Sequence, residues 1–312
     1  MNVQLQSTVN FKYTTIDNAA AEGDLDELKR MHQSGCEMSA TTTMYAAQGH
    51  LECLQYLHQA GCPWDESTNI YAAWNGHLDC LRYAHENGCP WGIQTTMHAA
   101  GGGHLECLRY LHQSGCQWDA TTTSWAAERG HLDCLRFLHQ AGCPWDESTT
   151  SAAAWSGHLD CLTFAFENGC KWDIDTTKSA ARNGHLECLQ YAFQNGCEWD
   201  DCITSWSAFG GYLDCLSFAL QNGCPVQMNT ILDRLVHNDV DKIDLETHVP
   251  LRSILFAMME NSANKIHTPY YQRIKELCDR KKEEIKLQQE VAFIECDVLP
   301  SQVVQYVVCN YF

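Results

Sequence analysis

The sequence is poor in basic residues and has no long apolar run. It contains 20 Lys and Arg residues against 39 Asp and Glu residues, a formal net charge of −19. Because a protein that binds DNA or RNA needs a basic face to neutralise phosphates, nucleic acid is not expected as a partner. The same repulsion disfavours anionic membrane surfaces. No apolar stretch approaches the ~18 residues of a membrane-spanning helix, so no membrane partner is expected either.

A secretion signal and an enzyme motif are also missing. Residues 1–7 lack the basic-then-apolar pattern of a secretion signal. The 19 cysteines are therefore expected to be free thiols in a reducing, intracellular (cytoplasmic) setting, unless they bind metal. No singular nucleophile, base or phosphate-binding loop stands out. We therefore predict a non-enzyme without a cofactor.

A short glycine-led signal recurs along most of the chain. In each copy a glycine is followed by His, Asp or Tyr, then by Leu, then by an acidic residue. The signal begins at Gly23, Gly49, Gly76, Gly103, Gly130, Gly157, Gly184 and Gly211. The first interval is 26 residues and every later one is 27. Eight copies at a fixed period indicate a repeat protein.

One copy shows what each repeat is expected to form. The hydroxyls of 121–123 are expected to cap a short helix over 124–129, and Gly130 ends it. A second helix is expected over 131–140, with leucines at three-residue steps, and Gly142 ends that helix. Neither helix can bury its apolar face alone, whereas stacked copies share one core. The sequence therefore predicts an all-α protein, an α-solenoid of about eight helix-turn-helix repeats.

At these residues the chain resembles the ankyrin-repeat family. The matching run has two alanines, Gly-His-Leu-Glu and spaced leucines, as in 99–115. An ankyrin repeat normally has about 33 residues, so this shorter repeat lacks the segment where the family has a projecting β-hairpin finger. The form with Cys-Pro-Trp-Asp is most similar to arrays of amoebae and of the giant viruses that infect them, and if the protein is viral its expected location is the host cytoplasm. The resemblance implies a non-catalytic protein that binds a partner protein on a concave face.

Cysteines and histidines recur with the repeat and are interpreted as packing residues. One cysteine column includes Cys134 inside the second helix, and the other includes Cys143 after it. Zinc needs four ligands at about 2.3 Å, while stacked helices lie ~8–10 Å apart, so we predict small apolar core residues and no metal site. The histidines after the repeat glycines, such as His131, and those near the ends of the second helices, such as His139, are expected to be hydrogen-bonded packing residues. Six linker tryptophans, including Trp145, are expected to cover the neighbouring repeat.

Residues that differ between repeats are the best candidates for function, because stacking does not dictate them. The two positions before the repeat glycine vary most, and by resemblance to ankyrins they lie on the concave face. The predicted partner-binding residues are Trp74, Asn75, Glu128, Arg129, Trp155, Arg182, Asn183 and Phe209. The alternative is that Trp74, Trp155 and Phe209 pack against adjacent repeats. Four further variable residues are expected to face the seam between helices, namely Tyr71, His98, Trp125 and Trp206.

The repeat stops near residue 226, and the composition changes. Residues 1–226 carry 10 basic and 26 acidic residues, whereas 227–312 carry 10 and 13. We therefore predict two parts, a repeat array over 1–226 and a helical C-terminal region over 227–312. The alternative for the second part is a C-terminal cap that only covers the last repeat.

The C-terminal region resembles a SOCS box, an adaptor segment of ubiquitin-ligase subunits. Three residues match its Leu-x-x-Leu-Cys core, which by resemblance inserts into the elongin B/C pair, namely Ile274, Leu277 and Cys278. Five match its later segment, associated with cullin choice, namely Leu299, Pro300, Val303, Tyr306 and Val307. The stretch from 299 also resembles the opening of an F-box, which implies Skp1 as the cullin-linked partner. The resemblance thus predicts a substrate adaptor of a cullin-type ligase, the alternative being a structural or assembly scaffold of a virion or host complex.

Overall fold

The computed structural model describes residues 12–225, and this range forms sixteen α-helices without any strand. The first helices of the repeats are α1 (Ile16–Ala21), α3 (Ala40–Ala46), α5 (Glu66–Trp74), α7 (Ile93–Gly101), α9 (Ala120–Glu128), α11 (Glu147–Ser156), α13 (Ile174–Asn183) and α15 (Cys202–Gly210). The second helices are α2 (Leu25–Gln33), α4 (Leu51–Gln59), α6 (Leu78–Glu86), α8 (Leu105–Gln113), α10 (Leu132–Gln140), α12 (Leu159–Glu167), α14 (Leu186–Gln194) and α16 (Leu213–Gln221). The predicted fold class, an all-α array of helix-turn-helix repeats, is confirmed.

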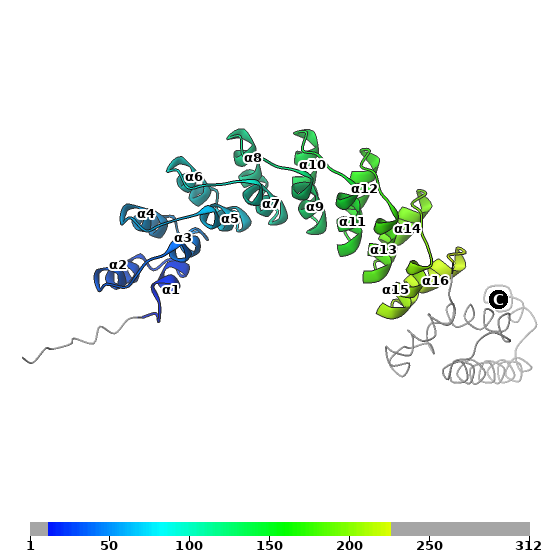
Figure 1. Ribbon diagram of the computed structural model, residues 1–312, viewed down its shortest axis with the longest axis horizontal. Coiled ribbons are helices and arrows are strands. Elements are labelled where there is room, and N and C mark those ends of the chain that lie inside the picture. The colour runs from blue at the N-terminus through cyan, green and yellow to red at the C-terminus, as the bar shows by residue number, and fades with distance from the viewer. Residues whose placement is uncertain (1–11, 226–312) are drawn as a thin grey trace, which may run out of the picture. The chain divides into compact units, whose positions relative to one another are not determined.

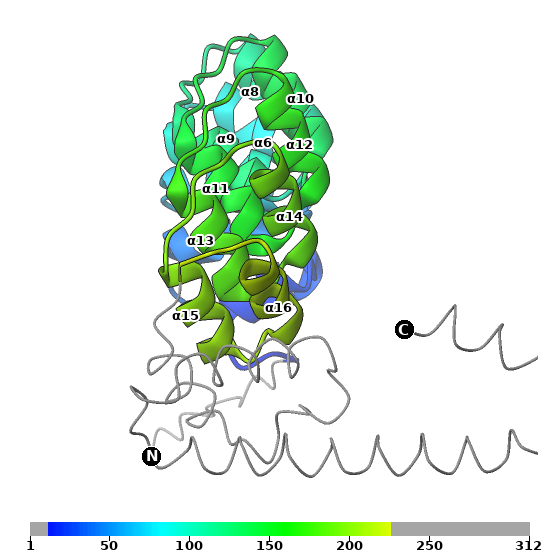
Figure 2. The ribbon, with the colours of Figure 1, turned by 90° about the vertical axis from the view of Figure 1, so that its right-hand side faces the viewer.

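The described helices belong to two compact units. The first unit extends to Glu198 and holds α1–α14, and the second begins at Trp199 and holds the pair α15 and α16. Within the first unit the helices form two curved layers, with the odd-numbered helices on the inner side and the even-numbered helices on the outer side (Figure 1). Seen along the array, these layers become two columns (Figure 2). Among residues 12–225, no helix combines the length and the apolar character that crossing a membrane requires.

The core of the first unit runs along the seam between the two layers. In one repeat the pair Ala126 and Ala127 from α9 and the leucines Leu135 and Leu138 from α10 are fully buried. Alanine leaves little side chain, so neighbouring first helices approach closely, while each buried leucine contributes about 1.5–3 kcal/mol. The same positions are buried in the other repeats, as the periodic pattern predicts.

The start of α9 differs from the predicted one. The carboxylate of Asp119 accepts the backbone N–H of Thr121 (2.9 Å), and the Thr122 hydroxyl accepts the N–H of Asp119 (3.4 Å). The buried Thr123 hydroxyl donates to the carbonyl oxygen of Ala120 in its own helix (2.8 Å), and it lies 3.2 Å from both the carbonyl oxygen of Pro144 in the joining segment and the Thr149 hydroxyl in the next repeat. The prediction that the hydroxyls of 121–123 cap the helix is therefore confirmed for Thr122, which completes a capping box with Asp119, and wrong for Thr121 and Thr123, because the aspartate just before the helix accepts the free N–H of Thr121. The threonine column joins successive repeats instead.

Candidate functional site

Apart from the partly exposed Cys36, the members of both cysteine columns are buried. Burial raises the pKa of Cys134, inside α10, to about 12, and does the same for Cys143 after that helix. The Cys143 Sγ donates a hydrogen bond to the carbonyl oxygen of Asp119 in the preceding repeat (3.4 Å). Since the thiolate is the form that binds metal or attacks an electrophile, these columns serve packing.

We expect the buried thiols to resist alkylation in the folded protein. With iodoacetamide at mildly alkaline pH, Cys134 and Cys143 should react at least about a hundredfold more slowly than the partly exposed Cys36, because so little of either thiol is ionised and reachable. Peptide mapping by mass spectrometry over a time course gives the rate at each cysteine. Denaturant should bring all three rates together, whereas fast native labelling of Cys134 would contradict a packing role.

The histidines that follow the repeat glycines pack between repeats. The ring of His158 lies so close to Gly130 that a Cβ built on this glycine would be 2.5 Å from the ring. The Nε2 atom of His50 lies 2.8 Å from the carbonyl oxygen of Ala21, a hydrogen bond between neighbouring repeats. Burial lowers the pKa of His131, which keeps its imidazole neutral at pH 7. The predicted packing role is confirmed for His50 and His158, and the predicted hydrogen bond is confirmed at His50.

The linker tryptophans cover the outer layer of the next repeat. Trp145 stacks on His139 (centroids 4.2 Å apart, planes at 19°) and meets the ring of Phe164 in the next repeat edge-on (6.2 Å). In another repeat His85 also forms a hydrogen bond to the hydroxyl of Tyr110 (2.7 Å). The stacking recurs at Trp64, Trp91, Trp118 and Trp172. The tryptophans therefore cover the neighbouring repeat, as predicted.

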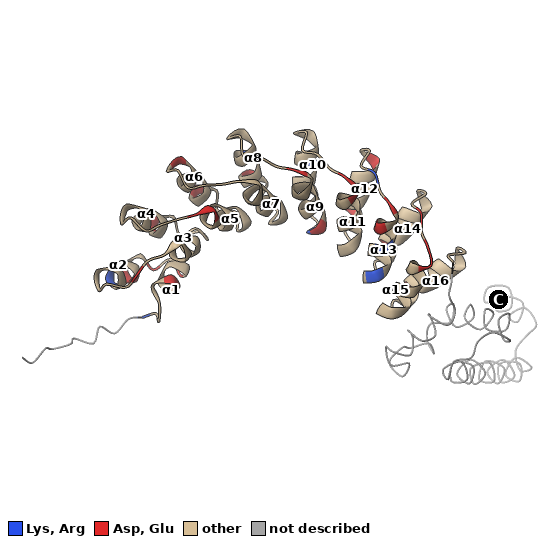
Figure 3. Cartoon of the chain, in the orientation of Figure 1, with Lys and Arg blue, Asp and Glu red and all other residues tan. Residues whose placement is uncertain are grey.

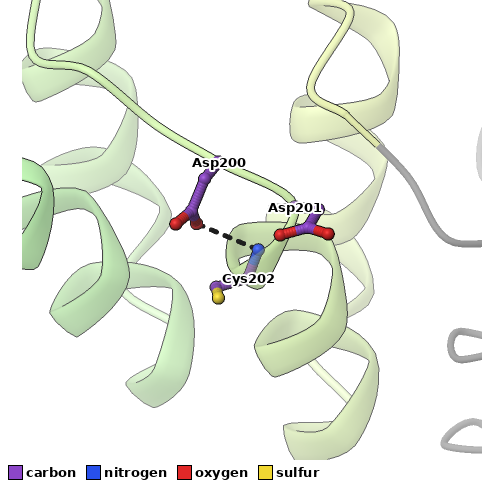
Figure 4. A group of neighbouring side chains, drawn as sticks. All are labelled: Asp200, Asp201 and Cys202. Atoms are coloured by element: carbon purple, nitrogen blue, oxygen red, sulfur yellow. Dashed lines mark hydrogen bonds between the residues drawn. The ribbon is translucent and has the colours of Figure 1, made fainter.

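One group of potential metal ligands occurs among the described residues, at the start of α15. Ligand atoms of Asp200, Asp201 and Cys202 lie within 4.8 Å of one another (Figure 4). The Asp200 carboxylate accepts the backbone N–H of Cys202 (3.0 Å), which matches the way Asp119 caps α9. The Asp200 carboxylate is thus engaged with the backbone at the start of α15, where Asp201 is the N-cap residue.

The predicted partner-binding residues of the first unit lie at what we call the inner ends, the last two residues before each repeat glycine. The C-terminal ends of the odd-numbered helices point toward the concave side of the curve (Figure 1). Trp155 is 42% exposed, Arg129 and Arg182 are exposed, and Trp74 and Glu128 are half-buried.

The other predicted partner-binding residues differ from these in setting. The side-chain amides of Asn75 and Asn183 donate to carbonyl oxygens of their own helices, at Tyr71 (2.9 Å) and Ser179 (3.0 Å), near the ends of α5 and α13. Phe209 lies in the second unit, 47% exposed, and meets Trp206 edge-on (6.0 Å). The candidate ligase-docking residues, from Ile274 to Val307, lie outside the described residues.

Three repeats bring aromatic rings together around one arginine. The ring centroids of Trp74 and Trp125 are 6.2 Å apart, and His98 lies 5.7 Å from the first ring and 5.1 Å from the second. The guanidinium carbon of Arg129 is 5.4 Å from the Trp74 centroid and 5.9 Å from the Trp125 centroid. We call these four residues the aromatic–arginine cluster. Together with Ile70 and Tyr71 they line a hollow of about 260 Å³.

Two glycines make this cluster possible. A Cβ on Gly101 would lie 2.8 Å from the Trp125 ring and 3.4 Å from the Trp74 ring, and a Cβ on Gly102 would lie 2.4 Å from the Trp74 carbonyl oxygen. The inner end of α7 therefore carries no side chain, and rings from the repeats on either side meet across it. The expectation that His98 and Trp125 face the seam between helices was wrong for this reason. The adjacent glycines 101–102 were the available sequence signal.

A second arginine lies on an indole farther along the same face. The guanidinium carbon of Arg182, at the inner end of α13, is 5.3 Å from the ring centroid of Trp155 at the inner end of α11. Many acidic residues lie along the segments that join successive repeats, where aspartates cap the first helices, and Glu128 lies beside Arg129 at the inner end of α9 (Figure 3). The inner ends of α9 and α13 thus present arginine on aromatic rings within an acidic protein.

The comparisons with known proteins agree with this architecture. A family model for ankyrin repeats in three copies matches residues 70–148 and 96–178, and a model for ankyrin repeats in many copies matches residues 43–85. No curated protein matches the sequence. The matched stretch includes the aromatic–arginine cluster and Trp155.

Proposed function

We propose that the protein is a non-catalytic recognition protein. The chain contains ankyrin repeats, and such repeats are protein–protein interaction modules. The partner protein would bind at the inner ends of α5–α13. The repeated cysteines and histidines support a role without catalysis, because their thiols and imidazoles pack between helices and repeats.

The observation that carries this proposal is the chemistry of the inner ends. Positions that stack repeats together keep one residue type, whereas the inner ends vary and carry Trp74, Arg129, Trp155 and Arg182. Tryptophan and arginine are the residue types that most often dominate binding energy at interfaces. Trp155 is 42% exposed at an inner end where the stacking of repeats does not require a large side chain. This exposure favours a contact with a partner protein.

The finer part of the proposal concerns the C-terminal region. We infer from sequence resemblance that 227–312 docks a cullin-type ubiquitin ligase, through elongin B/C at Cys278 or through Skp1 at Val303. The protein would then be a substrate adaptor that holds its target at the inner ends. The short-repeat resemblance to arrays of amoebae and giant viruses suggests the cells in which to seek the target.

Affinity purification with the full chain as bait tests both parts. We expect a target protein whose recovery falls at least tenfold when Trp155→Ala and Arg129→Gln are combined, because two exposed anchors are lost. Purified elongin B/C or Skp1 should bind the same bait, and Cys278→Asp or Val303→Asp should abolish the respective complex. Arg82→Gln, an exposed arginine over Tyr110 on the outer layer (5.0 Å), is the matched control.

Each arm has an outcome that contradicts it. If neither elongin B/C nor Skp1 binds the intact chain, the ligase part is wrong and a binding scaffold remains. If inner-end variants recover the target normally, while light scattering shows concentration-dependent oligomers, the assembly scaffold replaces the recognition protein.

A further inference from the structure

The aromatic–arginine cluster combines an apolar hollow with a charged rim. Its walls come from α5, α7 and α9, and the half-buried rings of Trp74, His98 and Trp125 supply most of them. A hollow of about 260 Å³ is large enough for one apolar side chain. The charge at its rim is that of Arg129, so the partner's charge beside that side chain affects binding.

A partner cation is disfavoured at this place. The faces of Trp74 and Trp125 that would attract a cation already hold the guanidinium of Arg129. A second cation would have to displace this group and then remain close to it, so like charges would oppose binding.

A partner carboxylate fits the exposed arginine. A guanidinium lying on an aromatic face keeps its N–H donors at its edge, in the fork geometry that matches a carboxylate. Among residues 12–225, no carboxylate oxygen lies within 4.0 Å of Arg129, including that of its neighbour Glu128. The Arg129 guanidinium therefore lies against the two indole rings, and its N–H donors remain available for a partner carboxylate.

The charge of the whole chain limits how acidic the partner segment should be. A formal net charge of −19 repels a long acidic tract, while a single carboxylate at Arg129 gains a short, direct ion pair. Charge complementarity therefore favours a segment with one or two acidic residues next to an apolar one.

We infer that the aromatic–arginine cluster is a binding site for a short peptide segment of the partner, in which an Asp or Glu side chain pairs with Arg129 and an adjacent aliphatic or aromatic side chain fills the hollow beside Trp74 and His98. This inference rests on the proposed function and specifies the chemistry of the partner.

Selection of random twelve-residue peptides displayed on phage, with the immobilised full chain as target, tests the inference. The enriched peptides should carry Asp or Glu beside an apolar residue. Their affinity, measured with synthetic peptides by isothermal titration calorimetry, should fall at least tenfold in Arg129→Gln and remain within twofold in Arg82→Gln. Gln keeps most of the packing on the rings but loses the charge, so this difference reports the ion pair.

Two further variants separate the ion pair from the hollow. Replacing the peptide's acidic residue by its amide should weaken binding to the unchanged protein about as much as Arg129→Gln does, and should add little in that variant. Gly101→Ala, which places a methyl group against both indoles and so reshapes the hollow, should weaken the same peptides while keeping the charge of Arg129. Circular dichroism checks that each variant folds.

The outcomes distinguish this inference from the proposed function. Enrichment of Lys- or Arg-rich peptides, insensitivity to Arg129→Gln, or no enrichment would overturn the acidic-segment inference. The recognition role would survive these results if the target captured by the full chain were still lost with Trp155→Ala. It would fail together with the inference only if every inner-end variant kept the target.

Discussion

Gly130→Ala should destabilise the repeat array by about 3 kcal/mol, whereas Gly142→Ala should cost only about 1 kcal/mol. Both glycines end a helix with positive φ, +75° and +80°, a conformation that costs a non-glycine residue about 1 kcal/mol or more. They differ in surroundings. A Cβ on Gly130 would lie 2.5 Å from the His158 ring, whereas nothing lies within 4 Å of a Cβ on Gly142. Overpacking adds about 1–3 kcal/mol at the first site alone.

Urea unfolding of the full-length variants, followed by circular dichroism, measures this difference. Adding His158→Ala to Gly130→Ala removes the ring that the new methyl group meets, so the remaining cost of the glycine substitution should fall toward that of Gly142→Ala. Equal costs at the two glycines would show that backbone conformation alone requires them, and that the histidine ring packs less tightly than the structure shows.

Trp145→Ala should destabilise the array by about 2 kcal/mol, whereas Trp155→Ala should change its stability by less than about 0.5 kcal/mol. Trp145 is half-buried, stacks on His139 and meets Phe164 of the next repeat, and aromatic pairs contribute about 0.5–1.5 kcal/mol each beyond the buried area. Trp155 is 42% exposed and its described ring partner is Arg182 on the surface. Surface substitutions of this kind rarely change stability.

The order of the two effects should reverse when target binding is measured, so that Trp155→Ala has a larger effect than Trp145→Ala. Trp155→Ala should lose target binding at least tenfold in a pull-down with nearly unchanged unfolding, since the exposed part of the indole becomes buried only with the partner. Trp145→Ala should retain the target at temperatures where it remains folded. A large loss of stability in Trp155→Ala would assign that residue to packing, the alternative that the sequence left open.

The candidate site was predictable in part. Position alone identified Trp74, Arg129, Trp155 and Arg182, because residues that vary within a repeat are free of stacking constraints. That Trp74 and Trp125, two repeats apart, would share one arginine was not predictable from a single repeat. Their meeting depends on the bare inner end of α7 between them.

The ends of the helices show the same division. The repeat glycines mark where helices stop, since a left-handed residue there is a local requirement that any sequence reading can recognise. The start of α9 was misread, because Asp119 and the threonines that follow it are all capable of capping. The structure shows that the Thr123 hydroxyl is engaged by the Ala120 carbonyl oxygen and by Pro144 and Thr149, whereas Thr122 takes part in the cap.

The amino-acid sequence by itself determined the fold class, the 27-residue period and the burial of the cysteine, alanine and leucine columns, because each follows from local preference repeated at one spacing. Tertiary structure alone decided which side chains form a site. Stacking brings residues about 27 or 54 positions apart into contact, and whether they touch depends on the size of the residue between them, a property of the assembled array rather than of any one repeat.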